Sequence, residues 1–197
     1  DLLIAADQPI SAQLIEEASA KKLGIAQTVV FPSMVSHGGE SKLSSLKAVS
    51  NAYPLRGTLQ ISRQDTLSKD KDLSVIEVTG MPPKNTVWVD PAVLISLKVK
   101  IGDRLTIGDR QFQIDAVIIR ELDRGAAFMN FAPRVMIALD DLASTGLIGF
   151  GSRVTYRLLL SGSDAQIKSY QTWATGFIEQ QKLRGIRIES LENAQPV

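Results

Sequence analysis

The two ends of this 197-residue chain carry the same pattern, and this pattern constrains the fold more than any other feature. Near the start, an apolar run at residues 2–6 precedes a segment at 11–23 with apolar residues every three or four positions, and a β-branched run follows at 25–31. Near the end, a run at 154–160 precedes a similar segment that starts after Ser163, its expected N-cap, and another apolar run follows. Such spacing indicates a helix between buried strands. The sequence therefore predicts two strand-helix-strand units.

The stretch between these units has a different character. It contains short alternating runs such as Val87-Trp88-Val89 and Phe112-Gln113-Ile114-Asp115-Ala116-Val117. Alternation with a period of two is typical of strands, and Gly102 and Gly108 supply turn signals around another such run. We therefore predict an α+β protein in which a β-rich subdomain is inserted into an outer α+β subdomain. The outer subdomain is predicted at 1–57 plus 152–197, and the inserted subdomain at 58–151.

Local signals predict some boundaries inside the first unit. Ser11 is the expected N-cap of its helix, and Gly24 is the expected left-handed residue after it. The turn sequence His37-Gly38-Gly39 is predicted to join residues 25–31 and 43–49 as a hairpin.

The segment Tyr53-Pro54-Leu55-Arg56-Gly57 is predicted to form the crossing between the two subdomains. Pro54 fixes its own φ angle, Gly57 permits a sharp turn, and the Arg56 guanidinium is suited to hold a carboxylate or backbone carbonyls. An ordinary loop is the alternative interpretation.

The run Ala126-Ala127-Phe128-Met129-Asn130-Phe131 places three large apolar side chains in a connection bracketed by turn signals. Two interpretations stay open. The run packs into the core, or Phe128, Met129 and Phe131 form an exposed tip that contacts a lipid-like substrate or a partner enzyme.

The charge balance and the residue inventory exclude several classes of function. Lys and Arg total 22 against 21 for Asp and Glu, so no net field attracts nucleic acid or an anionic membrane. The chain has no cysteine, and His37 is its only histidine, which lies beside a glycine turn without a nucleophile elbow. The carboxylates Asp65, Asp70 and Asp72 lack EF-hand spacing, and no phosphate-binding glycine loop is present. We therefore predict no catalytic residue, no metal site and no cofactor.

Two further expectations concern charges and chain context. Glu121 and Asp123 lie among Arg120 and Arg124, and such interleaved charges are typical of a surface ion-pair cluster. No run approaches the roughly 18 apolar residues of a membrane-spanning helix, and the first residue, Asp1, is not a methionine. We expect the chain to be a segment of a longer protein.

Several segments, taken in their order along the chain, resemble the YbbP family of ABC-transporter permeases, which are of the MacB and FtsX type. They are Phe31-Pro32-Ser33-Met34-Val35, Lys47-Ala48-Val49, Tyr53-Pro54-Leu55-Arg56-Gly57, Val87-Trp88-Val89-Asp90-Pro91, Asp123-Arg124-Gly125, Ala132-Pro133-Arg134 and Gly151-Ser152-Arg153-Val154-Thr155-Tyr156-Arg157. The resemblance covers the periplasmic domain between the first two membrane helices of such an inner-membrane protein.

The resemblance implies a porter-like outer subdomain, an inserted Sabre-like subdomain and a non-catalytic role. It also implies a homodimeric or pseudo-dimeric permease driven by a separate cytoplasmic ATP-binding subunit. Motion would then be relayed to the periplasm for extraction or export of hydrophobic compounds or lipids, in association with a periplasmic lysophospholipase or thioesterase. Two alternatives are a free-standing periplasmic binding protein for a small molecule, with a cleft between its subdomains, and an enzyme.

Overall fold

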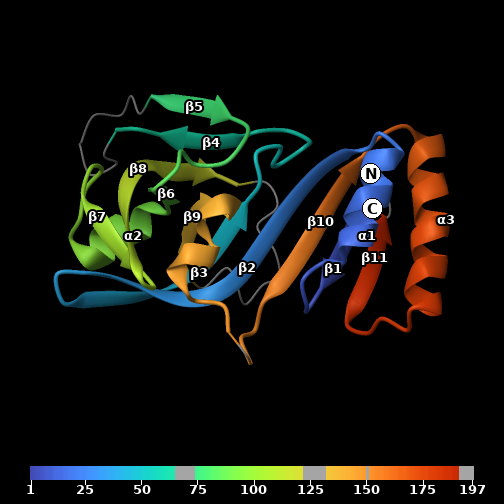
Figure 1. The fold of residues 1–197 in the computed structure, drawn as a ribbon. Helices are drawn as coiled ribbons and strands as arrows, with labels where there is room; N and C mark the ends of the chain where they lie inside the picture. The colour runs from blue at the N-terminus through green and yellow to red at the C-terminus, as the bar shows by residue number, and fades with distance from the viewer. Residues whose placement is uncertain (65–73, 122–131, 150, 191–197) are drawn as a thin grey trace.

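The computed structural model describes residues 1–64, 74–121, 132–149 and 151–190 (Figure 1). The elements of the first half are β1 (Leu2–Ala6), α1 (Ala12–Ala20), β2 (Gly24–His37), β3 (Glu40–Val49), β4 (Leu59–Ser62), β5 (Val75–Val78), β6 (Thr86–Val89) and α2 (Pro91–Leu97). Those of the second half are β7 (Arg104–Ile107), β8 (Arg110–Arg120), β9 (Arg134–Ala138), the 3-10 turns η2 (Leu139–Asp141) and η3 (Ala143–Thr145), β10 (Thr155–Ser161), α3 (Asp164–Gln180) and β11 (Ile186–Ser190). The predicted α+β class is confirmed.

Strands at one end of the molecule close into a ring. β2 pairs with β3, β3 with β9, β9 with β6, β6 with β8 and β8 with β7, and β7 returns to β2. A closed ring leaves no free edge among its strands, and its interior is filled by apolar side chains. That core includes Phe31, Val35, Leu46, Val87, Leu105 and Phe112, together with Val93, Leu94 and Leu97 from α2.

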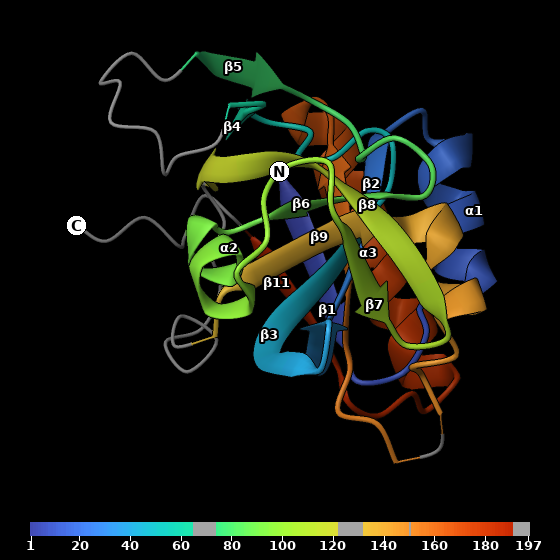
Figure 2. The ribbon, with the colours of Figure 1, turned by 90° about the vertical axis from the view of Figure 1, so that its left-hand side faces the viewer.

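The other end of the molecule is an open antiparallel sheet covered by helices. β2 continues into this sheet, in the order β11-β1-β10-β2. Helices α1 and α3 lie on the same face of it (Figures 1 and 2). Leu14 and Ala18 of α1 and Tyr170 and Ala174 of α3 are buried in one apolar cluster with strand residues such as Ile4. The two strand-helix-strand units therefore share a core.

Strand β2 belongs to both ends. Its residues 24–30 pair with β10, and Val35 and Ser36 pair with β7. β3 runs beside most of its length, from Thr28↔Val49 to His37↔Glu40, so the predicted hairpin is confirmed. The hairpin extends further into the ring than the sequence indicated. Because its strands pair with elements on both sides of the expected boundary, the predicted division into two subdomains stays a prediction.

Of the two boundary signals of the first helix, the N-cap position is confirmed and the left-handed residue is wrong. Ser11 occupies the N-cap position of α1, but its side chain makes no capping hydrogen bond. The left-handed residue after α1 is Lys22, with φ 59°, whereas Gly24 already begins β2. By contrast, Ser163 caps α3 as predicted. Its hydroxyl accepts from the Gln166 backbone N–H, and the Gln166 side chain accepts from the Ser163 N–H in return.

The β7–β8 hairpin confirms the turn predicted at Gly108. Ile107 pairs with Arg110 across a two-residue turn, and Gly108 has φ 59°. A Cβ at this position would lie 2.2 Å from the Thr145 carbonyl oxygen, so glycine is required both by the turn and by the close approach of the η3 backbone.

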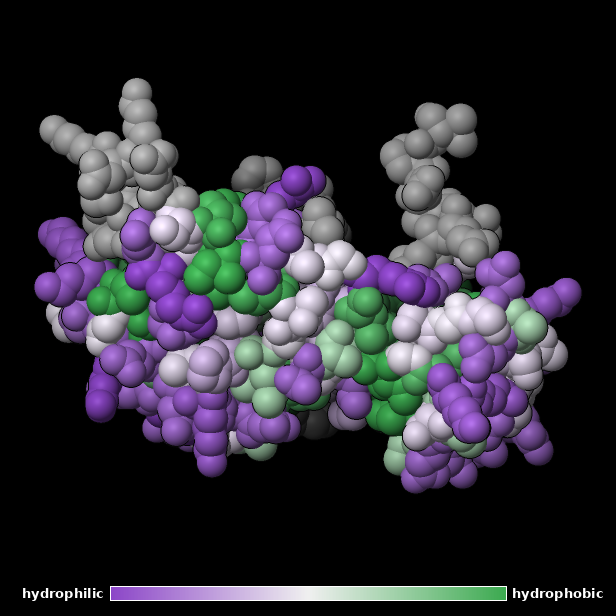
Figure 3. Space-filling view, turned by 90° about the horizontal axis from the view of Figure 1, so that it is seen from above, coloured by the Kyte–Doolittle hydropathy of each residue, from purple (hydrophilic) through white to green (hydrophobic). Residues whose placement is uncertain are grey.

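Strand β5 forms an edge of the sheet beside β4. Its Val75 and Ile76 side chains are exposed, and hydrophobic residues show on the surface at the end of the molecule that carries β4 and β5 (Figure 3). The first and last described strands are neighbours, because Leu2 of β1 pairs with Ser190 of β11. Among the described helices, none has the length and apolar character needed to cross a membrane.

Tyr170 ties the two helices together. Its hydroxyl donates to the Leu14 carbonyl at 2.7 Å, and its side chain is fully buried. Burial raises the pKa of Tyr170 above its ordinary value of 10.0, and nearby Glu17 raises it further. The folded protein therefore keeps this proton at alkaline pH, whereas the unfolded chain releases it.

This linkage gives a prediction about alkaline stability. Below about pH 10 the contribution of Tyr170 is complete, and it falls as the pH rises further, because only the unfolded state ionises. We expect Tyr170→Phe to lower the free energy of unfolding by about 1 kcal/mol near pH 7, through the lost hydrogen bond. The variant should then lose less stability than the wild type between about pH 9 and 11. Urea denaturation at several pH values measures both effects. Equal alkaline losses in the two proteins would exclude this role of Tyr170.

Candidate functional site

A buried cluster of charged side chains lies where β3, β8 and β9 meet. The Lys47 ammonium donates to Glu121 Oε2 at 2.8 Å, and the Arg134 Nε donates to Glu121 Oε1 at 2.9 Å. The exposed fractions of these side chains are 1% for Lys47, 2% for Glu121 and 5% for Arg134. Each carboxylate oxygen thus receives one cation in a site shielded from water. We call Lys47, Glu121 and Arg134 the buried ion cluster.

Neighbouring hydroxyl groups extend this cluster. Lys47 Nζ also donates to the Tyr53 hydroxyl at 2.8 Å and lies 4.6 Å from the centre of its ring. Arg134 Nη1 donates to Ser45 Oγ at 2.7 Å. Buried charges are tolerated only when they are paired and hydrogen-bonded, and this arrangement meets that requirement.

The strand period explains why Lys47 is buried. Its neighbours Leu46 and Ala48 point into the core of the ring, so Lys47 points to the opposite face. That face is also covered, by a second apolar cluster that includes Val49, Tyr53 and Met136. A lysine on a strand with both faces covered needs an anion, and Glu121 supplies it.

The surface cluster expected around Glu121 is therefore wrong for that residue. Its carboxylate is buried and bonded to Lys47 and Arg134, which are distant in the sequence. The neighbouring Asp123 and Arg124 lie outside the described residues. No signal in the local charge pattern separates this buried carboxylate from a solvated one.

The segment predicted as a crossing lies against this cluster. Tyr53 is buried and bonded to Lys47, whereas Arg56 is exposed and holds Asp1 through Nε at 2.5 Å and Nη2 at 3.1 Å. Gly57 has φ 73°, which favours glycine. Pro54 follows Tyr53 through a cis peptide bond. Arg56 thus holds a carboxylate, although the role of the segment as an interdomain crossing stays a prediction.

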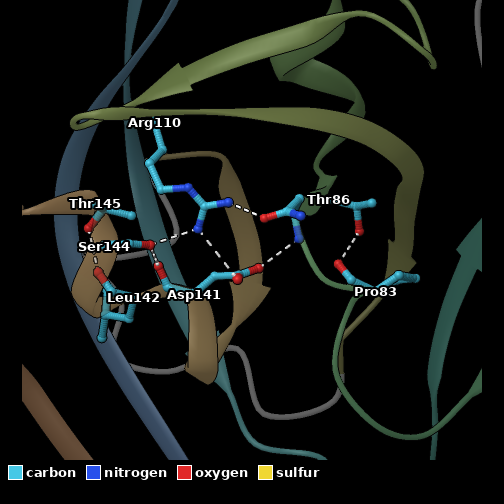
Figure 4. Close-up of polar contacts among 8 residues, drawn as sticks. Pro83, Thr86, Arg110, Asp141, Leu142, Ser144 and Thr145 are labelled. Carbon is cyan, nitrogen blue, oxygen red and sulfur yellow. Dashed lines mark hydrogen bonds and ion pairs between the residues drawn. The ribbon is translucent and has the colours of Figure 1, made fainter.

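A second polar cluster joins the β7–β8 hairpin to η2 and η3 (Figure 4). Arg110 donates to Ser144 Oγ at 2.7 Å, to Asp141 Oδ1 at 3.4 Å and to the side-chain oxygen of Asn85. The buried Asp141 also accepts from the Asn85 backbone N–H at 2.9 Å. These residues brace one end of the ring, and no local sequence pattern identifies them because they lie far apart in the chain.

Candidate catalytic groups are not assembled in the described part of the chain. His37 Nδ1 donates to the Arg104 carbonyl at 2.8 Å, which ties the hairpin tip to β7. No group of three or more His, Cys, Asp or Glu side chains able to hold a metal occurs among the described residues. The acidic residues Asp65, Asp70 and Asp72 lie outside them, as do Phe128, Met129 and Phe131 of the predicted contact tip.

A pocket of about 520 Å³ lies between the two ends of the molecule. Its lining is largely apolar and includes Ile10, Val29, Leu139, Leu142 and Tyr156, which come from the loop before α1, from β2 and β10, and from η2 and its flank. It is the described feature that comes nearest to the cleft expected of a small-molecule binding protein.

The buried ion cluster gives a stability prediction. Glu121→Gln keeps the size of the side chain but removes the negative charge that both buried cations contact, so we expect a loss of about 3 kcal/mol in the free energy of unfolding. Glu189→Gln is the matched control, because the Arg187–Glu189 pair is largely exposed. We expect the control to lose less than about 1 kcal/mol. Chemical denaturation of both variants provides the comparison. Equal small losses would show that the buried cations do not need Glu121.

Comparisons with known proteins show which proteins this chain resembles in sequence and in fold. No family model matches the chain. Over 174 residues, which are 88% of its length, the chain is 29% identical to an uncharacterized ABC transporter permease, YbbP, of Escherichia coli (strain K12). The aligned segment is 20% of that protein, so the chain spans about a fifth of this relative.

Two solved structures have the same fold. The extracellular domain of the noncanonic ABC-type transporter YknZ from Gram-positive bacteria matches with a TM-score of 0.61 at 12% identity, over 96% of this chain and 100% of that one. The periplasmic region of MacB from Actinobacillus actinomycetemcomitans matches with a TM-score of 0.57 at 11% identity, over 98% and 90% of the two chains. The resemblance found in the sequence is thus confirmed: the chain is similar in sequence to part of the permease YbbP and has the fold of the extracytoplasmic domains of YknZ and MacB.

Proposed function

We propose that this chain is the periplasmic domain of an inner-membrane ABC-transporter permease, and that it relays ATP-driven motion without catalysing a reaction. The observation that carries the proposal is the match of nearly the whole chain to extracytoplasmic domains of two ABC transporters, together with its sequence similarity to a permease. ATP hydrolysis then belongs to a separate cytoplasmic ATP-binding subunit.

A relay needs elements that transmit displacement without deforming, and the described structure supports this role. β2 is continuous through both ends of the molecule with β3 paired along most of it, and the ring on one side and the helix-covered sheet on the other are built on β2. Packed elements of this kind move as bodies and do not absorb displacement. The subdomains at 1–57 plus 152–197 and at 58–151, with Tyr53, Pro54, Arg56 and Gly57 at their crossing, belong to the same proposal.

The cargo proposed for this relay is a hydrophobic compound or a lipid, handed over with a periplasmic lysophospholipase or thioesterase. Its contact residues are Phe128, Met129 and Phe131, whose size and apolar character suit such a ligand. The alternative is a free-standing binding protein that holds a small molecule. The largely apolar pocket beside Val29 and Tyr156 favours that alternative.

The relay is testable with two labels, because the chain has no cysteine of its own. Ser41 near the hairpin tip and Ser169 on α3 are exposed, so Ser41→Cys and Ser169→Cys are suitable label sites. In the full-length permease with its ATP-binding subunit, we expect the distance between these labels to be the same with and without ATP. The distance from either label to labelled lipid headgroups should change.

The two distances also separate the competing proposals. A change in the label-to-label distance alone indicates a cleft that closes around a ligand, as in a binding protein, and contradicts the rigid relay. No nucleotide effect on either distance contradicts ATP-driven motion of this domain. The same preparation without the ATP-binding subunit is the control.

A further inference from the structure

We propose that the pocket between the two ends of the molecule binds a compact, neutral and mostly apolar molecule that carries one hydrogen-bonding group. The volume of this pocket is about 520 Å³, which lies within the range of sites for drug-sized ligands. We call it the junction pocket. The proposal goes beyond the relay of motion and does not rest on it, because it concerns only what the domain itself binds.

The junction pocket lies where two covering layers of one sheet face come together. Gln27 and Val29 of β2 share this face with Tyr156 of β10, because Val29 pairs with Tyr156 and side chains two positions apart point the same way. Ile10, before α1, packs against the cluster beneath the helices, whereas Leu142, after η2, belongs to the core of the ring. The floor of the pocket is the part of the sheet between these layers. A ligand held there therefore contacts both ends of the molecule.

Apolar groups make up most of the lining. Ile10, Leu139 and Tyr156 line the pocket and are only partly buried, so they present apolar surface to it. A ligand that replaces the water on such surface with apolar groups of its own is bound favourably. Pro9 and Ala143 also line the pocket, and both are exposed, so they mark its mouth.

One wall of the pocket is held in place by polar contacts (Figure 4). Arg110 donates to Ser144 Oγ at 2.7 Å and to Asp141 Oδ1 at 3.4 Å, which braces η2 and η3. Leu142 lies between these two turns, and its carbonyl accepts from Thr145 Oγ1 at 2.7 Å. These bonds exist without a ligand, and a preformed wall lowers the ordering cost of binding.

The charges around the junction pocket favour a neutral ligand. Arg157 is the only charged residue among the described residues that line it. It lies between Tyr156 and Leu158 on β10, so its side chain points to the opposite face of the sheet, and it already has an interaction partner. A buried charge without a counter-charge is costly. The lining therefore disfavours a ligand that carries a phosphate, a sulfonate or an ammonium group.

Two polar groups on the floor are suited to bond the ligand. The Gln27 backbone N–H donates to Ser50 Oγ, but within the described part of the chain the Gln27 side-chain amide and the Tyr156 hydroxyl have no hydrogen-bond partner. Gln27 is the diagonal neighbour of Tyr156 across the β2–β10 pair, which is within reach of long side chains. One N–H, O–H or carbonyl group of a ligand is therefore enough to engage this part of the floor.

Two probes with the same aromatic skeleton test the ligand class. Phenylnaphthylamine is neutral, fluorescent and mostly apolar, and it carries one N–H group. We expect saturable binding of one molecule to the 197-residue chain, seen as a rise in its fluorescence. Anilinonaphthalene sulfonate adds a negative charge, and we expect it to bind at least about tenfold more weakly. No saturable binding of phenylnaphthylamine, or equal binding of the two probes, overturns the proposal.

A pair of tryptophan variants tests the location. Ala143→Trp places a large side chain at the mouth, so we expect it to abolish saturable binding of phenylnaphthylamine. Ala165→Trp is the matched control, because Ala165 is exposed on α3 and does not line the pocket. We expect this control to bind as the wild type does. Equal binding by the two variants overturns the location, and urea denaturation shows whether each variant is folded.

A third ligand tests the polar groups and decides the location even if Ala143→Trp does not fold. Benzylnaphthalene has a methylene group in place of the N–H, and we expect it to bind about fivefold more weakly than phenylnaphthylamine. This difference should disappear in Gln27→Leu/Tyr156→Phe, which removes both hydrogen-bonding groups of the floor. A difference that persists in this variant overturns the site.

A lysophospholipid is the last competitor, because the cargo proposed above is a hydrophobic compound or a lipid. Weaker displacement of phenylnaphthylamine by this lipid than by benzylnaphthalene supports a compact ligand. Stronger displacement by the lipid assigns the pocket to the cargo and overturns the compact ligand. The relay is judged separately, because its label distances are measured without any of these probes.

Discussion

The architecture depends on one strand that takes part in two sheets. β2 supplies backbone partners to β10 in the helix-covered sheet and to β7 in the ring, while β3 pairs along most of it. A strand has two edges, so this dual pairing is possible only because β2 is fourteen residues long and its neighbour on one edge changes from β10 to β7. The core of the ring and the core beneath the helices are both organised on this strand, with Val29 and Phe31 in the core of the ring and Ile25 beside the core beneath the helices. The ends of the molecule are therefore mechanically continuous.

Much of the fold was readable from sequence where local chemistry decides the outcome. The hairpin at Gly38-Gly39, the turn at Gly108 and the N-cap at Ser163 depend on a few adjacent residues, and all three were predicted correctly. Ring closure was not predicted, because it depends on the pairing of Val35 and Ser36 with a strand about seventy positions later. No local pattern in β2 distinguishes the stretch that pairs with β7 from the stretch that pairs with β10.

The buried charges show where residue patterns stop being informative. Lys47 lies in an apolar run, which indicates burial of its neighbours, but the second covering layer over β3 is contributed by distant residues such as Tyr53 and Met136. Glu121 follows an arginine and was assigned to the surface for that reason, although its partners are Lys47 and Arg134. Only the tertiary structure shows that one carboxylate bonds two cations there. The Arg110–Asp141 cluster was missed for the same reason.

The length of the β2–β3 hairpin has a geometric consequence. At about 3.3 Å per residue, the fourteen residues of β2 extend at most roughly 45 Å. A strand held by β10 at one end and by β7 at the other acts as a lever, so that a rotation of about 5° at the helix-covered sheet sweeps the far tip through about 4 Å. Angular changes too small to disturb side-chain packing thus become displacements comparable to the spacing between neighbouring strands. Such amplification requires a long strand that does not bend. Backbone pairing along both edges of β2 limits its bending.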